Sequence, residues 1–281
     1  MERYWDLINE IVRESDIILE VLDARFPELS RNIQAEEIID KFKRPCIIVL
    51  NKADLVDRKE LEKSILKLQK EFEYSRDKTQ IVYVSTKHIT TIKTLLAHIR
   101  ILFGKNGKRP EFSGITIKRP FREAKGDIIV GVIGYPNVGK SSIINSLSFK
   151  KKAKVSKKAG TTHGIHWIKA SEEIRLIDTP GVIPLNYETE VKLGLIAARS
   201  PEKIKEPDLV AERVIEMFIQ NKKLRDLEDF YKIKFQEKDN SSIILREISI
   251  KKNHLKKGGE PDEERTSTMI IKDWQQGKLR L

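Results

Sequence analysis

Short apolar runs rich in β-branched residues alternate along this chain with amphipathic segments. Runs of this length and composition are typical of strands that are buried on both faces of a parallel sheet. Most of the segments between them carry apolar residues at intervals of three and four, as helices do when one face packs on a sheet. This alternation predicts a doubly wound α/β sheet. The expected strands are 17–23, 46–51, 81–85, 128–134 and 174–178, with 166–170 as an antiparallel edge strand.

The strand pattern ends near residue 185, and the rest of the chain is expected to be helical. Its final run begins with Pro261, carries acidic residues in its first turn and reaches Gly277, which is the usual order of helix start and stop signals. We therefore expect an α/β domain over residues 1–185 and a helical domain over residues 186–281. The segment "PDLVAERVIEMFIQ" is expected to bury one apolar face, formed by Leu209, Val210, Val214, Met217 and Phe218.

The composition is that of a globular protein with a basic surface. Of the 281 residues, 39% are hydrophobic and 34% are charged, and the formal net charge is +12. Such an excess is typical of proteins with a polyanionic partner, nucleic acid first among them, although a basic surface without such a partner has the same composition. The first residues lack the blocks of a signal peptide, and no apolar run has the length of a membrane span. We therefore expect a cytoplasmic protein with no membrane partner. The lone Cys46 excludes a disulfide within the chain.

A glycine-rich stretch, "GYPNVGKS" at residues 134–141, follows the expected fourth strand. It matches the pattern G-x-x-x-x-G-K-[ST] through Gly134, Gly139, Lys140 and Ser141. Glycines let successive backbone N–H groups converge on phosphate oxygens, and the helix that follows directs its positive end at them. Lys140 is expected to reach the β- and γ-phosphates of a nucleoside triphosphate, and the Ser141 hydroxyl to ligate Mg²⁺.

Two shorter motifs downstream supply further groups for a triphosphate. "LIDTPG" at residues 176–181 places Asp178 at a strand end, where its carboxylate can hold Mg²⁺ through water, and the Gly181 N–H can approach the γ-phosphate. Between this motif and the glycine-rich stretch, "AGTTHG" at residues 159–164 offers the Thr162 hydroxyl as another Mg²⁺ ligand. Each motif alone is a weak signal, but their order and spacing reinforce one another.

The tetrapeptide "NKAD", residues 51–54, closes the expected second strand and has the form of a guanine-recognition motif. The Asp54 carboxylate can accept hydrogen bonds from guanine N1–H and from the N2 amine. Adenine presents an acceptor at N1 and no such amine, so this residue selects GTP over ATP. Lys52 can lay its alkyl stem over the base, and Asn51 can hold the loop. A helix N-cap at Asp54 is the structural alternative.

The motif "STK", residues 85–87, closes the next strand and favours base recognition, because the Thr86 backbone N–H can donate to guanine O6. The motifs therefore come in the order base, base, phosphate, switch I, switch II, whereas the base motif normally follows the phosphate loop. Joining the old termini and opening the chain elsewhere preserves a site built from neighbouring strands. We predict a circularly permuted P-loop GTPase sheet (G4-G5-G1-G2-G3), with the old ends joined in the Gly-, Pro- and Lys/Arg-rich linker 104–127.

Over essentially its whole length the chain resembles the circularly permuted GTPases of the YlqF/YawG family, also called RbgA-like. The resemblance rests on "DARFP" at residues 23–27, on "GYPNVGKSS" at residues 134–142, and on a C-terminal run with a G-K-L pattern. It implies hydrolysis of GTP to GDP and phosphate, Mg²⁺ as cofactor, and action as an assembly factor on the large ribosomal subunit and its rRNA. A monomer is expected. The residues expected to contact the nucleotide are Asn51, Lys52, Asp54, Ser85, Thr86, Lys87, Asn137, Val138, Gly139, Lys140, Ser141, Ser142, Thr162, Asp178 and Gly181.

By the same resemblance, Asn137 stands where potassium-activated GTPases carry an asparagine that helps to hold K⁺ beside the phosphates; a plain turn residue is the alternative. Such an ion neutralises developing charge as an arginine finger does. Val182 stands where many GTPases have a water-positioning glutamine, so slow intrinsic hydrolysis is expected until a partner completes the site. The family's F-P-G-H-M stretch, with its histidine, is absent from the first residues. His163 and His166 flank the predicted switch I and could take its place, but histidines at a surface or a strand end more often have no catalytic role. The residues expected to act in catalysis are Lys140, Asn137, Thr162 and Gly181.

The positive charge is concentrated near the predicted switch I, where "KKKAKVSKK" at residues 150–158 carries six lysines. A solvated loop is the plain interpretation, but a nucleotide-sensitive loop of this charge also suits contacts with RNA phosphates. Two other functions stay open on the sequence: a nucleotide-gated RNA-binding module with negligible turnover, and a GTPase of another RNA pathway. The linker is expected to add RNA contacts from Lys105, Lys108, Arg109, Lys118, Arg119, Arg122 and Lys125.

Overall fold

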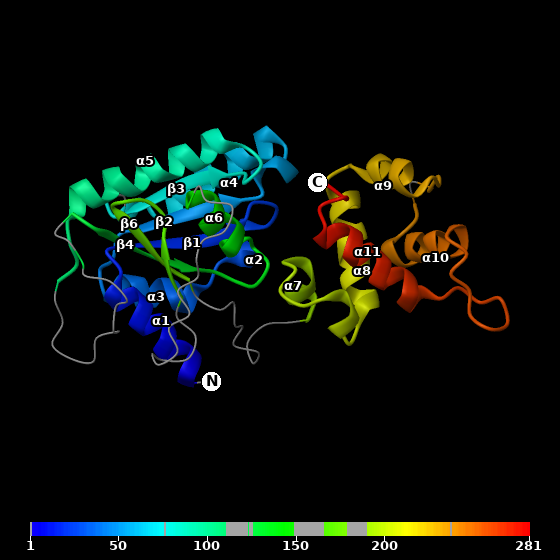
Figure 1. The fold of residues 1–281 in the computed structure, drawn as a ribbon. Coiled ribbons are helices and arrows are strands. Elements are labelled where there is room, and N and C mark those ends of the chain that lie inside the picture. The colour runs from blue at the N-terminus through cyan, green and yellow to red at the C-terminus, as the bar shows by residue number, and fades with distance from the viewer. Residues whose placement is uncertain are drawn as a thin grey trace. The chain divides into compact units, whose positions relative to one another are not determined.

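The computed structural model describes residues 2–75, 77–110, 123, 126–148, 166–178, 190–236 and 238–281. The chain divides into two compact units, Met1–Pro184 and Leu185–Leu281. Figure 1 shows the helices and strands of both units, and each unit has its own buried core. The first is an α/β structure, and the described part of the second is helical.

A sheet with strand order β3-β2-β1-β4-β6-β5 forms the centre of the first unit. All its neighbouring strands are parallel except β5 and β6, which pair antiparallel at one edge. Every residue of β1, β2 and β4 is buried, which explains their continuous apolar sequences. The predicted doubly wound sheet and its antiparallel edge strand are confirmed, with boundaries shifted by two residues or fewer. The strands are β1 (Ile17–Asp23), β2 (Cys46–Asn51), β3 (Thr79–Val84), β4 (Ile128–Ile133), β5 (His166–Lys169) and β6 (Ile174–Asp178).

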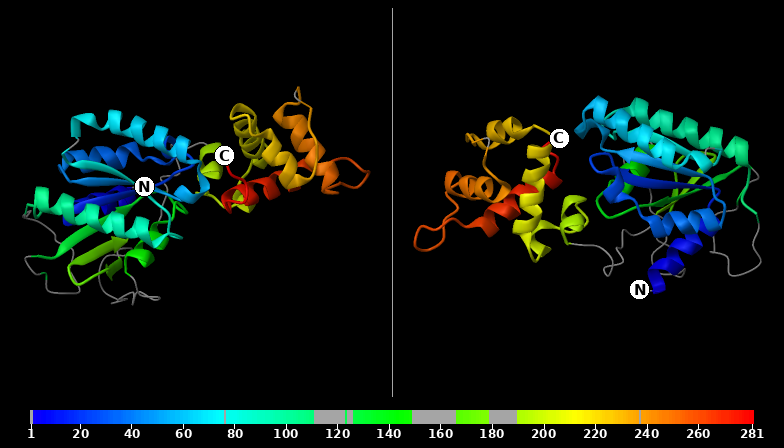
Figure 2. Two further views of the ribbon diagram at one scale, coloured as in Figure 1. Left: turned by 90° about the horizontal axis from the view of Figure 1, so that it is seen from above. Right: turned by 180° about the vertical axis from the view of Figure 1, so that it is seen from behind.

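Helices cover both faces of this sheet (Figures 1 and 2). α1, α3 and α4 share one hydrophobic core with β1, β2 and β4, while α5 and α6 pack together on the opposite face. Right-handed crossovers explain this division, because the chain moves along the sheet in one direction from β1 to β3 and in the other direction from β3 to β4. The elements are α1 (Glu2–Glu14), α2 (Pro27–Ser30), α3 (Ile33–Lys41), η1 (Ala53–Leu55), α4 (Arg58–Glu71), η2 (Glu73–Ser75), α5 (Ile89–Asn106) and α6 (Lys140–Leu147).

The first helix, α1, has no counterpart among the predicted elements. Its residues Ile8, Ile11 and Val12 recur at helical spacing and are buried against the sheet. Because they precede the first strand, this helix is not a crossover and lies outside the strand–helix alternation on which the prediction rested.

Helix α5 runs into the start of the predicted linker, and the described residues that follow it make ordered contacts with the α/β unit. α5 continues to Asn106, and the next residues converge on the fully buried side chain of Asp16. Arg109 Nη1 lies 2.8 Å from Asp16 Oδ1, and both Arg109 and Lys108 also pair with Glu123. Only 9% of the Arg109 side chain is exposed, so the prediction that this residue contacts RNA phosphates is wrong. A buried cation is instead neutralised by buried carboxylates.

The second unit is built around α8, with α11 packed along it (Figures 1 and 2). The indole of Trp274 is fully buried, meets the ring of Phe218 edge-on, and donates from Nε1 to the Leu195 carbonyl at 3.1 Å. This bond joins α11 to the end of α7. The elements are α7 (Glu190–Leu195), η3 (Pro201–Lys203), α8 (Pro207–Gln220), α9 (Leu224–Tyr231), α10 (Ser241–Lys251) and α11 (Glu263–Gln275).

The sequence signals for α11 hold, whereas the predicted buried face of α8 is confirmed only for Val210, Val214 and Phe218. The Asp262 side chain accepts from the Arg265 N–H as an N-cap of α11, and Gly277 has the positive φ of a helix end. On α8, however, Leu209 is 51% exposed, so its predicted place on the buried face is wrong. Ala211 and Ile215 are buried on that helix. None of the described helices is long and apolar enough to cross a membrane.

Candidate nucleotide-binding site

The glycine-rich stretch forms the turn between β4 and α6, as the pattern predicted. Gly134 and Gly139 have φ values of 141° and 102°, and Asn137 is also left-handed. A Cβ atom on Gly134 would lie 2.4 Å from the Val21 carbonyl oxygen, so only glycine fits there. The turn therefore leads into the amino end of α6, where backbone N–H groups without helical partners can bind anions.

Lys140 is the first residue of α6, and its ammonium points back toward the glycine-rich turn that precedes this helix. Its Nζ donates to the carbonyl oxygens of Gly134 and Tyr135, both at 2.8 Å. Burial lowers the pKa of Lys140 to about 8, and the nearby Asp178 carboxylate opposes that shift. A largely buried cation at the mouth of a phosphate-type loop is suited to binding a polyphosphate, because the anion would compensate the cost of burial.

Asp178 ends β6 on the strand beside the phosphate loop, opposite Val132 in the register. Its Oδ1 atom is buried and has no hydrogen-bond partner among the described residues. Burial raises the pKa of Asp178, while Lys140 and His166 oppose the shift. An unsatisfied carboxylate oxygen fits a hard cation and its water, and the exposed hydroxyl of Ser141 supplies a second oxygen of the kind Mg²⁺ prefers. Ser142, also predicted to contact nucleotide, is exposed as well.

Asn51 joins the base motif to the phosphate loop. Its Nδ2 atom donates to the Val138 carbonyl oxygen at 2.7 Å, although the two residues are 87 positions apart. Asn51 is 2% exposed, and a Cβ on Gly139 would lie 2.1 Å from the same Nδ2 atom. The structure therefore brings together the two motifs whose order in the chain was unusual.

Asp54 lies in η1, and its two carboxylate oxygens face the next motif. Oδ1 accepts from the Ser85 hydroxyl at 2.8 Å, and Oδ2 pairs with Lys87 Nζ at 2.6 Å. Burial raises the pKa of Asp54, but the bonds from Lys87 and Ser85 outweigh it, so this pKa lies below its ordinary value. The N-cap of η1 is Lys52 and that of α4 is Asp57, so the helix-cap alternative for Asp54 is wrong.

Several predicted residues lie beyond what the structure describes. Thr162, His163, Gly181, Val182 and the lysine run 150–158 fall in ranges outside the described residues. Thr86 is exposed in the turn after β3, consistent with a backbone N–H that a base could reach. His166 begins β5 and is opposite Asp178 in the register.

Two residues of "DARFP" belong to the site although the sequence assigned them no role. Asp23 ends β1, opposite Asn51 in the register, and its carboxylate binds Lys52 Nζ at 2.8 Å. Arg25 forms a second ion pair with Asp23, and both of these side chains are fully buried. The signal that could have found them is their position, since ligands of such sheets bind at the carboxyl ends of the parallel strands, where these polar residues lie.

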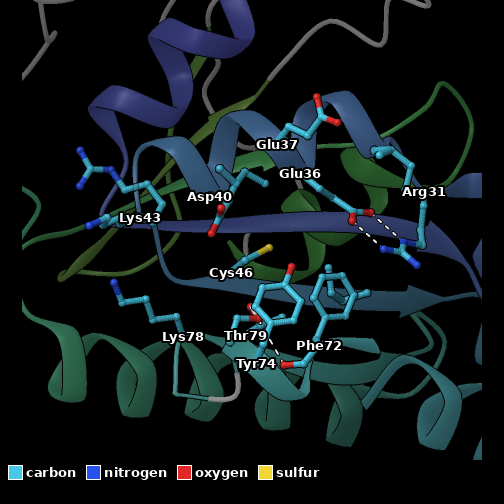
Figure 3. A pocket seen from close by; sticks show the side chains of 15 residues that line it. Arg31, Glu36, Glu37, Asp40, Lys43, Cys46, Phe72, Tyr74, Lys78 and Thr79 are labelled. Atoms are coloured by element: carbon cyan, nitrogen blue, oxygen red, sulfur yellow. Dashed lines mark hydrogen bonds and ion pairs between the residues drawn. The ribbon is translucent and has the colours of Figure 1, made fainter. Parts of the chain in front are cut away.

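A separate cavity of about 330 Å³ lies at the amino ends of β2 and β3 (Figure 3). Cys46 and Thr79 begin these strands and line it together with the rings of Phe72 and Tyr74. It contains no residue of the nucleotide motifs. The cavity is therefore distinct from the candidate site at the carboxyl ends.

Comparison with known proteins finds a matching family model, curated relatives and solved structures. Residues 129–247 match the family model described as "50S ribosome-binding GTPase". The match begins in β4, so "NKAD" lies before it in the chain.

Among curated relatives, the "Uncharacterized GTP-binding protein MJ1464" of Methanocaldococcus jannaschii is 37% identical over 97% of this chain and 65% of its own length. "Nuclear/nucleolar GTPase 2" of Arabidopsis thaliana is 31% identical over 99% of this chain and 44% of its own length. The chain thus spans about half to two thirds of these relatives.

Solved structures of YlqF have the same fold. The GDP-bound form is 24% identical, covers 97% of this chain and 95% of its own, and has a TM-score of 0.63. The GNP-bound form from T. maritima has a TM-score of 0.57 at 22% identity and covers 98% of this chain and 94% of its own. Both agree with the predicted P-loop GTPase sheet followed by a helical region. These matches show that homologues of the chain are GTP-binding proteins and that its fold is the fold of YlqF, in keeping with the geometry of its motifs.

Proposed function

We propose that this protein binds GTP with Mg²⁺ in a circularly permuted G domain, hydrolyses it to GDP and phosphate, and serves assembly of the large ribosomal subunit. The observation that carries the proposal is the bond from Asn51 Nδ2 to the Val138 carbonyl at 2.7 Å. It joins a motif suited to guanine with a loop suited to phosphates, as one nucleotide-binding site requires. The family description and the printed names of the relatives, GTPases of the nucleolus among them, support the same conclusion.

Base selection falls to Asp54 and the turn that follows β3. Ser85 and Lys87 hold the Asp54 carboxylate in one orientation, which lowers the entropic cost of presenting it to a ligand. Guanine offers two adjacent donors to this acceptor, and the Thr86 N–H supplies a donor for O6. The purine that satisfies all these groups is guanine rather than adenine.

Phosphate binding falls to the turn before α6 and to Lys140. The ammonium that now caps the Gly134 and Tyr135 carbonyls would move onto the β- and γ-phosphates, aided by backbone N–H groups at the helix start. Ser141, Thr162 and Asp178 would hold Mg²⁺, which neutralises charge on the phosphates when bound. Asn137 would hold K⁺ in the same way, and the Gly181 N–H would face the γ-phosphate.

Hydrolysis by the free protein should be slow. The side chain of Val182 has no polar atom with which to orient water, so a group from the partner is expected to complete the site. The net charge of +12 suits a particle made largely of RNA. The lysine-rich segment 150–158 is proposed to contact this RNA. The cytoplasmic location and monomeric state expected from the sequence stay predictions.

The decisive experiment is GTP turnover in potassium buffer with and without purified large ribosomal subunits, with sodium buffer and small subunits as controls. Strong stimulation by large subunits alone would support both the activity and the partner. Tight GTP binding without stimulation by any subunit would contradict the ribosomal role and favour a nucleotide-gated RNA-binding module. Turnover stimulated only by another RNA would instead favour a different RNA pathway.

A further inference from the structure

The motif "DARFP" places a buried carboxylate at the carboxyl end of β1, where the nucleotide motifs meet. Asp23 Oδ1 accepts from the backbone N–H and the Nε of Arg25 at 3.1 and 3.0 Å, and Oδ2 accepts from Arg25 Nη2 at 2.8 Å. The Asp23 backbone N–H donates to the Ser30 hydroxyl at 3.0 Å. Hydrogen bonds from Arg25 therefore fix both oxygens of the Asp23 carboxylate, and the Ser30 bond fixes its backbone.

Arg25 is itself held in place. Its guanidinium lies 5.2 Å from the centre of the Phe26 ring, and its side chain is fully buried. A charged pair without contact with solvent keeps its geometry only when its hydrogen bonds are well formed, because desolvation is costly. The Asp23–Arg25 pair is thus a rigid feature at the end of β1.

A third charged group joins this pair from another strand. Lys52 follows β2, and its Nζ lies 2.8 Å from Asp23 Oδ2 with 21% of the side chain exposed. Arg25 already supplies hydrogen bonds to both carboxylate oxygens, so Asp23 does not need Lys52 for charge balance. Lys52, in contrast, has its ammonium fixed by Asp23 while its main chain adopts the left-handed conformation, with φ of 62°. Both ends of its alkyl stem are therefore fixed.

We propose that Asp23, held by Arg25, is a positioning residue for the guanine base: it anchors the Lys52 ammonium so that the lysine stem forms a preformed wall of the base pocket. This inference rests on the proposed binding of guanine nucleotides. A lysine side chain has considerable rotamer entropy, and fixing it before the ligand arrives lowers the cost of binding. The burial that raises the pKa of Asp23 is outweighed by Arg25 and Lys52, which agrees with a permanently charged anchor.

The test is a double-mutant cycle with Asp23→Asn, Lys52→Met and the double variant, read out as the Kd of a fluorescent GDP analogue. We expect each single variant to weaken binding about tenfold, and the double variant to be no weaker than Lys52→Met, because Asp23 acts through Lys52. Additive losses, or an unchanged Kd in Asp23→Asn, would overturn the proposal. If Asp23→Asn does not fold, Asp23→Glu keeps the charge but displaces it, and the same non-additivity is expected.

Asp16→Asn serves as the matched control. Asp16 is another fully buried carboxylate of the same unit, paired with Arg109 and outside the nucleotide motifs. The Asp16→Asn variant is expected to lower the Tm while leaving the Kd of the GDP analogue unchanged, which separates loss of stability from loss of positioning. Failure of the proposed function would look different, since the wild-type protein would then not bind the GDP analogue. Tight binding by wild type with an additive cycle would overturn only the role of Asp23.

Discussion

The side-chain amide of Asn51 donates to the main-chain carbonyl of Val138, across 87 positions of sequence. Val138 is fully buried, so its carbonyl has no access to solvent as a substitute for this bond. We expect Asn51→Ala to weaken GDP binding by about tenfold or more, because the phosphate loop loses its tie to the base motif. Isothermal titration calorimetry would measure the change. An unchanged affinity would contradict this role of Asn51, and a parallel Tm measurement would show how much of any loss reflects unfolding.

Asp54→Asn should change which nucleotide is bound. The amide presents a donor where guanine also has donors, so GTP affinity should fall by about a hundredfold, whereas xanthine, with a carbonyl at C2, should gain affinity. Competition between GTP and XTP for a fluorescent analogue would measure both effects. Asp57→Asn, just after the motif, is the control and should leave the preference for GTP intact. Equal losses for both nucleotides in Asp54→Asn would count against base recognition by Asp54.

Nucleotide binding should take up a proton at alkaline pH. In the free protein the Lys140 pKa is lowered to about 8 by burial, so the ammonium is largely deprotonated above that pH. Phosphates favour the charged form, so binding at pH 9 should restore the proton and affinity should decline as the pH rises above about 8. Calorimetry in buffers of different ionisation enthalpy measures this uptake. A binding enthalpy independent of the buffer at pH 9 would refute this uptake. The control is a measurement at roughly pH 6.5, which lies below the range in which Lys140 titrates.

The same lysine has a consequence for folding. Between about 8 and its ordinary value of 10.5, the unfolded chain holds the Lys140 proton and the folded protein does not. Stability therefore gains from this group as the pH rises through that window. Comparison with Lys140→Arg, which stays charged throughout, isolates the effect in urea titrations.

Glu20 should make stability fall between mildly acidic and neutral pH. It is fully buried in β1, its Oε1 accepts from the Asn32 N–H, and burial raises its pKa to about 8. Between the ordinary value of 4.5 and about 8 the folded state binds the proton and the unfolded state does not, so the stabilisation is complete below this window and is lost as the pH rises through it.

The variant that tests this is Glu20→Gln, because glutamine has nearly the same shape as glutamate and does not ionise. Its unfolding free energy relative to wild type should increase from pH 5 to pH 8 by an amount on the order of 3 kcal/mol. Urea denaturation at the two pH values measures it. The exposed Glu37→Gln is the control and should show no such trend. A constant difference for Glu20→Gln would mean that Glu20 is ionised in the folded protein throughout.

The sequence by itself determined the strands, the type of fold and the individual motifs. These depend on local properties: a buried parallel strand requires a continuous apolar run, and the phosphate turn requires glycine at Gly134, where any side chain would meet the Val21 carbonyl. The start of α11 at Asp262 and its end at Gly277 follow from capping in the same way.

Tertiary structure decided through which atoms these pieces meet. Asn51 reaches Val138 and Lys52 reaches Asp23 because β1 lies between β2 and β4, an order that no local pattern specifies. The same holds for charges that looked free: Arg109 was expected to face RNA and is instead buried against Asp16. Leu209 fits an apolar face by spacing, yet the described residues leave 51% of it exposed. Long-range pairing depends on the whole packed arrangement, so it is seen only when the chain is folded.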